Sequence, residues 1–449
     1  MGVKLVFKII KIRIEGLFDQ SSHEFNLHLE GITILHAPNG FGKTTMLKLI
    51  DHIFNGRLFE LKRIPFRKVD VFFSDQSRLE IIKERRSRNI VDETQVERIS
   101  YEYHKVDGES QIFQPKLRLT KRYSITVLEE LLPFLERVGP ELWEHTETGE
   151  ILDYHDVIKL YGTFLPLAPE YDWPDWLKTI RKKISVHFIG AHRLLQTSPL
   201  QSKNKRQNRE KYQSAVRHFS NELVLSIQSK LAQWSAYSHE MDRTFPERLL
   251  SARKEQEKLS LSSKEQIEKK LKELEFKRAR LARVGLIDQI TEDQNFSIDN
   301  LDEFTCRLLS LYIEDTERKL KYFDDLEERL NLLLELVNKK FLNKELVIQR
   351  DQGFVIYVNN RKKKLEVDEL SSGEQHILVM YYQLLFQTEP GEIVLLDEPE
   401  LSLHIGWQGQ FVEDLYDIMT LRKMTILIAT HSPDIIDGRW NLTVALENP

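Results

Sequence analysis

The chain has 449 residues, of which 41% are hydrophobic and 30% are charged, and this composition excludes a mainly disordered protein. Its length predicts two or three domains. The formal net charge of -5 gives no global sign of nucleic-acid binding, so any basic surface must be local. The single cysteine, Cys306, excludes an internal disulfide and a zinc site made of clustered cysteines.

Neither membrane insertion nor secretion is expected from the sequence. The longest apolar runs fall far short of the ~20 residues that a membrane span needs. The first residues also lack the long apolar core of a secretory signal. We therefore expect a cytoplasmic protein with no membrane partner.

The first half of the chain predicts short strands and some helix. Alternating or compact apolar residues are typical of strands, and apolar residues three or four positions apart are typical of helices. Strands are predicted over residues 3–14, 25–29, 32–35, 69–73, 79–82, 99–103, 117–123 and 184–189. Helical structure is predicted over residues 44–54 and 127–160, and a proline- and aromatic-rich connection over 165–176.

The middle of the chain has a different texture. Residues 201–217 are polar and basic, and residues 253–283 and 308–337 are long, charged and leucine-striped. A break at residues 285–300 separates the two long segments. Two antiparallel helices joined by a turn, as a helical hairpin or short coiled coil, are the natural interpretation.

A phosphate-binding loop is predicted between the strand over 32–35 and the helix over 44–54. The eight residues from Ala37 to Thr44 have P-loop spacing, with Ala37 in place of the first glycine. Glycines let backbone N–H groups surround the phosphates, and the helix N-terminus adds partial positive charge. Lys43 would reach the β- and γ-phosphates of ATP, and the Thr44 hydroxyl would bind Mg²⁺. The predicted ATP-binding residues are Ala37, Pro38, Asn39, Gly40, Phe41, Gly42, Lys43, Thr44 and Thr45.

Further motifs near the C-terminus suit the same chemistry. The apolar run over residues 393–396 precedes Asp397, which suits the Mg²⁺ shell, and Glu398, which suits polarisation of the attacking water. A Ser-Ser-Gly-Glu motif opens a helix and would present hydroxyls and a helix N-terminus to an anion. Its residues are Ser371, Ser372, Gly373 and Glu374. The strand over 426–430 ends at His431, which would complete the phosphate site.

In this order the four motifs resemble an ABC-class ATPase head of the Rad50/SMC/RecF/OLD branch, within the AAA-family ATPases. The resemblance implies an α/β fold with a P-loop core on a mixed sheet and an antiparallel β lobe, interrupted by the helical hairpin. It implies ATP hydrolysis with Mg²⁺, with Lys43, Glu398 and His431 as catalytic residues. It also implies a head-to-head dimer, which higher homo-oligomers can extend, in which the Ser-Ser-Gly-Glu signature contacts the γ-phosphate held by the other subunit.

The same resemblance assigns two further loops. The D-loop would comprise Leu401, Ser402, Leu403 and His404. The candidate Q-loop contains His192 and Arg193, with histidine where relatives often have glutamine. The expected organisation is residues 1–200 for the first part of the head, with a helical segment over 127–180. Residues 201–343 would form the helical insertion, and residues 344–449 the second part of the head.

Several roles fit such a head. A transporter subunit is improbable because its signature would follow its P-loop much sooner. A nuclease domain in the same chain is not expected, because little sequence follows His431 and because Asp414 and Asp417 are interpreted as solvated charges. The size and motifs resemble the separate ATPase subunits of anti-phage systems, first the AriA family of PARIS and second the PtuA family of Septu. Such a subunit would sense a phage-encoded trigger and control a co-encoded nuclease, of Toprim type by preference or of HNH type.

Two alternatives stay open at this point. A RecF- or Rad50-like ATPase of DNA repair is one, since basic residues outnumber acidic ones over residues 253–283 and DNA is a possible partner. An ATP-dependent scaffold with little hydrolysis is the other.

Overall fold

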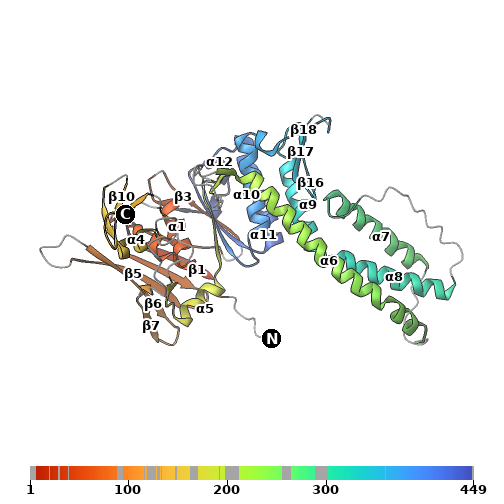
Figure 1. The fold of residues 1–449 in the computed structure, drawn as a ribbon, viewed down its shortest axis with the longest axis horizontal. Helices are drawn as coiled ribbons and strands as arrows, with labels where there is room; N and C mark the ends of the chain where they lie inside the picture. Colours follow the sequence, from red (N-terminus) through yellow and green to blue (C-terminus); the bar gives the residue numbers. More distant parts are fainter. Residues whose placement is uncertain are drawn as a thin grey trace. The chain divides into compact units, whose positions relative to one another are not determined.

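The structure is a computed structural model, in which the chain forms two compact units (Figure 1). Unit 1 comprises Met1–Phe188, Pro390–Glu398 and Lys423–Pro449, and unit 2 comprises Ile189–Glu389 and Pro399–Arg422. The structure describes residues 7–19, 21–28, 31–38, 40–87, 95–115, 117–118, 128, 132, 134–146, 149–161, 170–191, 193–197, 212–254, 264–288, 302–358 and 361–446. Within these ranges, no helix is both long and apolar enough to cross a membrane.

A parallel sheet forms the centre of unit 1. Its strands in spatial order are β13 (Val186–Ile189), β19 (Ile393–Asp397), β20 (Thr425–Thr430), β3 (Ile32–His36) and β21 (Thr443–Ala445). The β19–β20, β20–β3 and β3–β21 pairs are parallel. Every residue of β19 is buried, as expected for a strand covered on both faces. Helix α1 (Lys43–Phe54) follows β3, and its buried side chains belong to the core of unit 1.

An antiparallel sheet of six strands forms the second part of unit 1. Its order is β2 (Ser21–Asn26), β1 (Ile9–Leu17), β4 (Lys68–Phe73), β5 (Arg78–Ser87), β6 (Gln95–His104) and β7 (Ser110–Phe113). One face is apolar and includes Leu79, Ile81 and Tyr101, which share a core cluster with α1 residues such as Ile50. The alternation in the sequence therefore has its usual cause, burial of one sheet face. The resemblance to ABC-class heads implied such an antiparallel β lobe, and alternation in the sequence predicted parts of its strands.

The predicted helix over residues 127–160 is wrong over most of its length. Residues 135–153 form a small antiparallel sheet instead, and among the described residues of this segment the helical ones are Leu128 and those of α4 (Tyr154–Tyr161). Trp143 is fully buried on the central strand and anchors a separate core cluster. The three strands are β9 (Leu135–Arg137), β10 (Leu142–His145) and β11 (Ile151–Asp153). Strands this short do not display enough alternation to compete with a helical pattern.

The remaining elements of unit 1 are short. Helix α5 (Asp175–Lys183) precedes β13, the strand at one end of the parallel sheet's order. Its Arg181 side chain lies over the Trp173 ring at 3.9 Å and donates to the Ile53 carbonyl of α1. Burial lowers the pKa of Arg181 below its ordinary value. The other bounds are α2 (Leu58–Arg63), β8 (Leu117–Arg118), β12 (Glu170–Tyr171), α5 (Asp175–Lys183), α12 (Pro433–Ile436) and a 3₁₀ turn (Trp440–Leu442).

Unit 2 is mainly helical. Its buried helix α10 packs against α6, α9 and α11, and α9 and α6 also contact the small sheet β16–β17–β18. The helices are α6 (Ala215–Lys254), α7 (Lys264–Arg283), α8 (Glu303–Lys321), α9 (Asp324–Asn338), α10 (Ser372–Phe386) and α11 (Ile405–Arg422). The other elements are β14 (Leu195–Thr197), β15 (Tyr212–Ser214), β16 (Lys344–Gln349), β17 (Gly353–Val358), β18 (Lys363–Leu365) and a 3₁₀ turn (Val367–Glu369).

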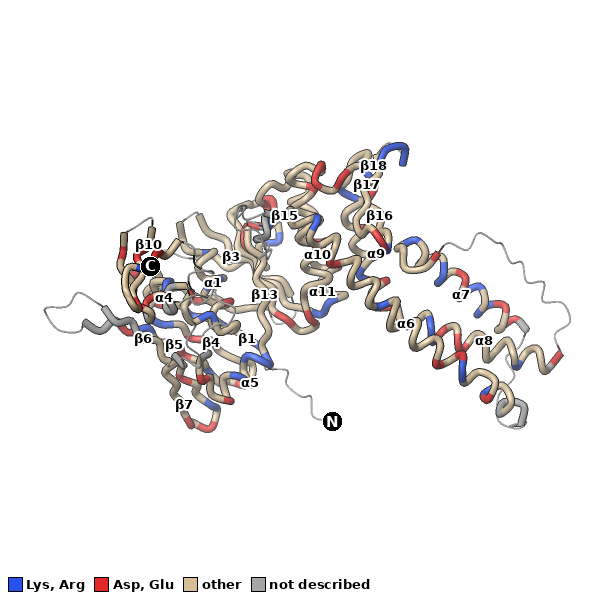
Figure 2. Tube along the Cα trace, viewed as in Figure 1, with Lys and Arg blue, Asp and Glu red and all other residues tan. Residues whose placement is uncertain are grey.

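The second helix of the predicted long pair is divided into two helices in the structure. The segment over 308–337 belongs to two helices, α8 and α9, which meet at Tyr322–Phe323, and α8 packs against both α6 and α7. Basic and acidic residues are interspersed along α7 (Figure 2). Three of its basic residues form ion pairs with acidic residues of α8 and α9. The pairs are Lys270–Glu317, Lys277–Asp324 and Arg280–Glu327.

A buried ion pair joins the helices around α10. Lys340 Nζ lies 2.6 Å from Asp414 Oδ2, and both side chains are buried. The hydroxyl of Tyr381, on α10, donates to the same carboxylate oxygen. The interpretation of Asp414 as a solvated charge is therefore wrong. Burial raises the pKa of Tyr381 well above its ordinary value, and the charge of Asp414 adds to the effect.

Replacing Lys340 by methionine should destabilise unit 2 strongly. The Asp414 carboxylate would remain buried without its cation, and loss of one partner of a buried pair costs about 3–5 kcal/mol. The matched control is Lys339→Met at the neighbouring, exposed position, which should change stability by at most about 0.5 kcal/mol. Urea denaturation would measure both. Equal effects of the two substitutions would contradict the importance of the pair, and Lys340→Met/Asp414→Leu should recover much of the loss.

Candidate nucleotide-binding site

The predicted phosphate loop lies between the central strand β3 and helix α1. Gly42 immediately precedes the helix and has φ 81°, a left-handed conformation that favours glycine. Lys43 is the first residue of α1 and is buried, and its ammonium donates to the carbonyl oxygens of Ala37 and Pro38 at 2.6 and 3.0 Å. Thr45 lies in the first turn of α1 and Phe41 packs against the core. Pro38 and Gly40 are exposed on the loop, and Asn39 lies outside the described residues.

Gly42 is required by space as well as by conformation. A Cβ atom at this position would meet Leu17 Cδ2 at 2.8 Å and Phe18 Cε2 at 3.1 Å. The Phe18 side chain is 44% exposed, although it lies beside the loop. Sequence reasoning missed Phe18, because an aromatic residue just after a strand gives no sign that the phosphate loop passes next to it. An exposed aromatic ring at this place could stack on a nucleotide base.

The two residues predicted to bind Mg²⁺ are in direct contact. Thr44 Oγ1 donates a hydrogen bond of 2.7 Å to Asp397 Oδ1. Asp397 is the buried last residue of β19, and β20 separates this strand from β3. A hydroxyl and a carboxylate are the hard oxygen ligands that Mg²⁺ takes from proteins beside phosphate oxygens. The residues present therefore fit a Mg²⁺–nucleotide complex.

Glu398 and His431 lie at the same edge of the parallel sheet. Glu398 follows β19, donates its backbone N–H to the Ala429 carbonyl of β20 and has φ 42°. A left-handed conformation at a non-glycine residue is strained, and such strain is concentrated at functional sites. His431 follows β20, and its Nδ1 lies 3.8 Å from Glu398 Oε1. The carboxyl ends of β3, β19 and β20 thus bring the loop, both carboxylates and the histidine together.

The predicted signature begins helix α10 in unit 2. Ser371 caps the helix, and its backbone N–H and hydroxyl both donate to Glu374 Oε2 at 2.8 Å. Lys344 Nζ contacts the same carboxylate at 2.7 Å. Burial alone would raise the pKa of Glu374, but the bonds from Lys344 and Ser371 outweigh it and lower that pKa. Ser371 and Glu374 therefore have a structural task, whereas Ser372 is exposed in the first turn of α10.

The signature glycine touches the predicted D-loop of the same chain. A Cβ atom on Gly373 would lie 2.6 Å from the backbone oxygen of Ser402, too close for any side chain. Ser402 has φ 66°. In the same loop Leu403 is buried, Leu401 is half-buried and the His404 ring accepts a hydrogen bond from the Gly406 N–H.

The candidate Q-loop is only partly described. His192 lies outside the described residues. Arg193 belongs to unit 2 and is buried, and its guanidinium contacts the sulfur of Met380 on α10 at 2.7 Å. A Q-loop role for either residue stays a prediction.

Comparison with known proteins assigns the chain to a family. The family model described as "AAA domain, putative AbiEii toxin, Type IV TA system" matches residues 38–437. Protein ea59 of Escherichia phage lambda is 29% identical over 92 residues, which are 20% of this chain and 17% of that protein. The match therefore spans less than a fifth of that relative.

Two solved structures are also similar. One is the Smc head domain with an extended coiled coil, bound to the C-terminal domain of ScpA from Pyrococcus furiosus, with 13% identity and a TM-score of 0.35. The similarity covers 99% of this chain and 94% of the Smc head chain. The other is the SmcHead bound to the C-winged helix domain of ScpA, with 10% identity and a TM-score of 0.35. The similarity covers 98% of this chain and 94% of the SmcHead chain. These TM-scores carry no structural conclusion. The family model, by contrast, spans most of the sequence, including Lys43, Asp397, Glu398 and His431, and the chain belongs to this AAA domain family.

Proposed function

We propose that the chain is an ABC-type ATPase that binds ATP with Mg²⁺ and hydrolyses it. The observation that carries this proposal is the contact between Thr44 and Asp397, with Glu398 beside it at the same sheet edge. Membership of the AAA domain family supports the nucleotide chemistry. A loop glycine with positive φ and the N-terminus of α1 supply inward-facing N–H groups for the phosphates.

The proposed roles follow from position. Lys43 exchanges its bonds to the loop carbonyls for bonds to the β- and γ-phosphates, while Thr44 and Asp397 hold Mg²⁺. Glu398 orients and polarises the attacking water, and His431 lies close enough to hold the Glu398 carboxylate in place. Phe18 stacks on the base. Positioning and electrostatics are the main contributions that a protein makes to phosphoryl transfer, and this site offers both.

Substitutions of Lys43 and Glu398 should affect different steps. Lys43→Ala removes charge-assisted bonds worth about 1.5–3 kcal/mol and should weaken ATP binding by roughly 10- to 100-fold. Glu398→Gln should retain ATP but slow turnover by about 10²–10⁴-fold. Equilibrium binding of ATP and steady-state phosphate release would separate the two effects. Exposed Lys48→Ala and Glu413→Gln are the matched controls, and normal turnover in Glu398→Gln would remove this residue from its role.

We also propose that two chains share each site. In this arrangement the signature of one chain meets the ATP held by the phosphate loop of the other, so a two-fold dimer has two composite sites. Ser372 is the residue best suited to such a contact, because it is exposed at the start of α10 while Ser371 and Glu374 are bonded to each other.

Mixing two inactive variants tests this sharing. Lys43→Ala and Ser372→Arg should each abolish hydrolysis alone. Random mixing makes about half of the dimers mixed, each with one intact site of two, so activity should recover to roughly one quarter of wild type. A bulky residue at Gly373 would be a poorer choice, since it would also displace Ser402 in its own chain. Subunit exchange is first verified with labelled chains, and absence of recovery despite exchange would contradict independent shared sites.

The cellular role that we propose is sensing and scaffolding in an anti-phage complex. The family description refers to a toxin of a toxin–antitoxin system, which supports a defensive role, and the motifs resemble the PARIS (AriA) and then the Septu (PtuA) ATPase families. The ATPase would hold a separate nuclease, of Toprim type or of HNH type, and release it when a phage protein is sensed. A DNA-repair role is less favoured, because three of the basic α7 residues that could contact DNA form ion pairs with α8 and α9.

This role predicts that the chain needs a partner. The purified chain with ATP and Mg²⁺ or Mn²⁺ should leave plasmid DNA intact, and phage protection in cells should require both this gene and a neighbouring nuclease gene. Lys43→Ala should abolish protection, and Lys48→Ala should not. Cleavage by the pure chain that a substitution within it abolishes would contradict the proposal, as would full protection without the neighbouring gene.

A further inference from the structure

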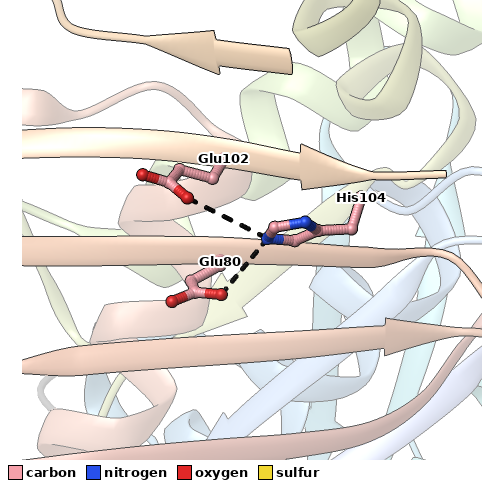
Figure 3. Close-up of side chains that lie close together, drawn as sticks. All are labelled: Glu80, Glu102 and His104. Atoms are coloured by element: carbon pink, nitrogen blue, oxygen red, sulfur yellow. Dashed lines mark hydrogen bonds and ion pairs between the residues drawn. The ribbon is translucent and has the colours of Figure 1, made fainter. Parts of the chain in front are cut away.

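Three potential metal ligands converge on the polar face of the antiparallel sheet in unit 1 (Figure 3). Glu80 lies on β5, and Glu102 and His104 lie two residues apart on β6 and so project to the same face. Glu80 and Glu102 are directly opposite each other in the strand pairing. His104 Nε2 lies 3.3 Å from Glu80 Oε2 and 4.0 Å from Glu102 Oε2, and the three donor atoms lie within 4.8 Å of one another.

We propose that Glu80, Glu102 and His104 bind a divalent transition-metal ion, for which Zn²⁺ is the reference. Donor atoms in a tetrahedral zinc site with bonds of about 2.1 Å are roughly 3.4 Å apart. The shortest separation in the cluster already has this value, and small side-chain movements bring the other donors within range. An imidazole with two carboxylates suits zinc better than Mg²⁺, which prefers oxygen ligands alone. Three protein ligands leave a fourth position open to water.

The cations around Glu80 can be rearranged to admit a metal ion. Lys68 Nζ binds Glu80 Oε1 at 2.9 Å, whereas Arg78 Nη2 occupies Glu80 Oε2 at 2.9 Å, the oxygen closest to His104. Arg78 Nε is also 3.8 Å from Asp70 Oδ1. This buried oxygen has no hydrogen-bond partner within the described part of the chain.

Asp70 therefore offers Arg78 a second position. It lies opposite Glu80 on the neighbouring strand β4, and its carboxylate is 1% exposed. A metal ion on Glu80 Oε2 would move the guanidinium towards Asp70 Oδ1, so that Arg78 would satisfy a buried acceptor. The network contains three carboxylates, those of Asp70, Glu80 and Glu102, and two cations, Lys68 and Arg78. Its net charge is therefore -1 when His104 is neutral, which is the form of histidine that binds metals. The network can thus accept a divalent ion without leaving a buried carboxylate unpaired.

Solvent can reach the proposed site. The side chains of Glu102 and His104 are 25% and 33% exposed, whereas that of Glu80 is 11% exposed. A bound ion would join the paired strands β5 and β6 on the open face of the sheet. Leu79, Ile81 and Tyr101 on the opposite face share their core with α1, so the ion would also stiffen the support of the phosphate loop.

Zinc titration of the full chain tests this proposal. Protein freed of metal with a chelator, without nucleotide, should bind one Zn²⁺ per chain in calorimetry, and Zn²⁺ should raise its melting temperature. Glu102→Gln and His104→Ala should each weaken Zn²⁺ binding by about 100-fold or more. Loss of a residue that binds the metal directly should reduce affinity at least as much as loss of a group that only orients such a residue. Arg78→Gln should strengthen binding, because it removes the cation that competes for Glu80 Oε2.

Two control variants exclude other sites. His28→Ala removes an exposed histidine of the same unit, and Asp397→Asn alters the proposed Mg²⁺ site; neither should change the Zn²⁺ affinity. Melting curves without metal identify any variant that fails to fold. The proposal is overturned if the wild-type chain shows no saturable binding up to about 1 mM Zn²⁺. It is equally overturned if binding survives in both Glu102→Gln and His104→Ala.

Discussion

The hydrogen bond from Thr44 to Asp397 joins residues 353 positions apart in the sequence. The order of the parallel strands in unit 1 brings these two residues together. Thr44 lies on the helix that follows β3, and Asp397 ends β19. One strand, β20, lies between them, in parallel register with both. The carboxyl ends of three parallel strands therefore share an edge, and the phosphate loop, the carboxylates and His431 meet there. The antiparallel sheet and α5 support this edge through the core that they share with α1.

The place of the proposed phosphate loop between a strand and a helix could be predicted because the chemistry of such a loop fixes both residue types and spacing. A helix must follow the loop, and carboxylates must end a buried strand, so the local sequence carries the whole pattern. Ala37 is consistent with this requirement, since the positive φ values among the described loop residues fall on Gly40 and Gly42 and not on the first position. Parts of the strands of the antiparallel lobe could be predicted from their alternation, whereas the lobe itself was implied by the resemblance to ABC-class heads.

Other features depend on contacts that lie far apart in the sequence. Short strands such as β10 are stabilised by burial of Trp143, which no local pattern reveals. Asp414 is an ordinary helix-surface residue by sequence, and only the packing of α9 places Lys340 against it. The 40-residue helix α6 falls within the predicted helical insertion over residues 201–343, but no separate helix was predicted over its residues; it contains Pro246 in its interior. Sequence periodicity also gives no means to recognise Phe18, which lies beside Gly42, or the Glu80–Glu102–His104 cluster, which depends on the pairing of β5 with β6.

The close approach of Gly373 to Ser402 has a consequence for how this protein can change over generations. The atom in the way is a backbone oxygen, so no replacement of the Ser402 side chain could make room for a larger residue at 373. A compensating substitution would have to move the main chain of the loop between β19 and α11, where Ser402 is already held in a left-handed conformation. No single substitution of Gly373 can therefore be accommodated without a change in the backbone of the neighbouring loop. Exposed Ser372, one residue earlier, meets no such steric limit, so its variation is limited instead by the contact with ATP proposed for it.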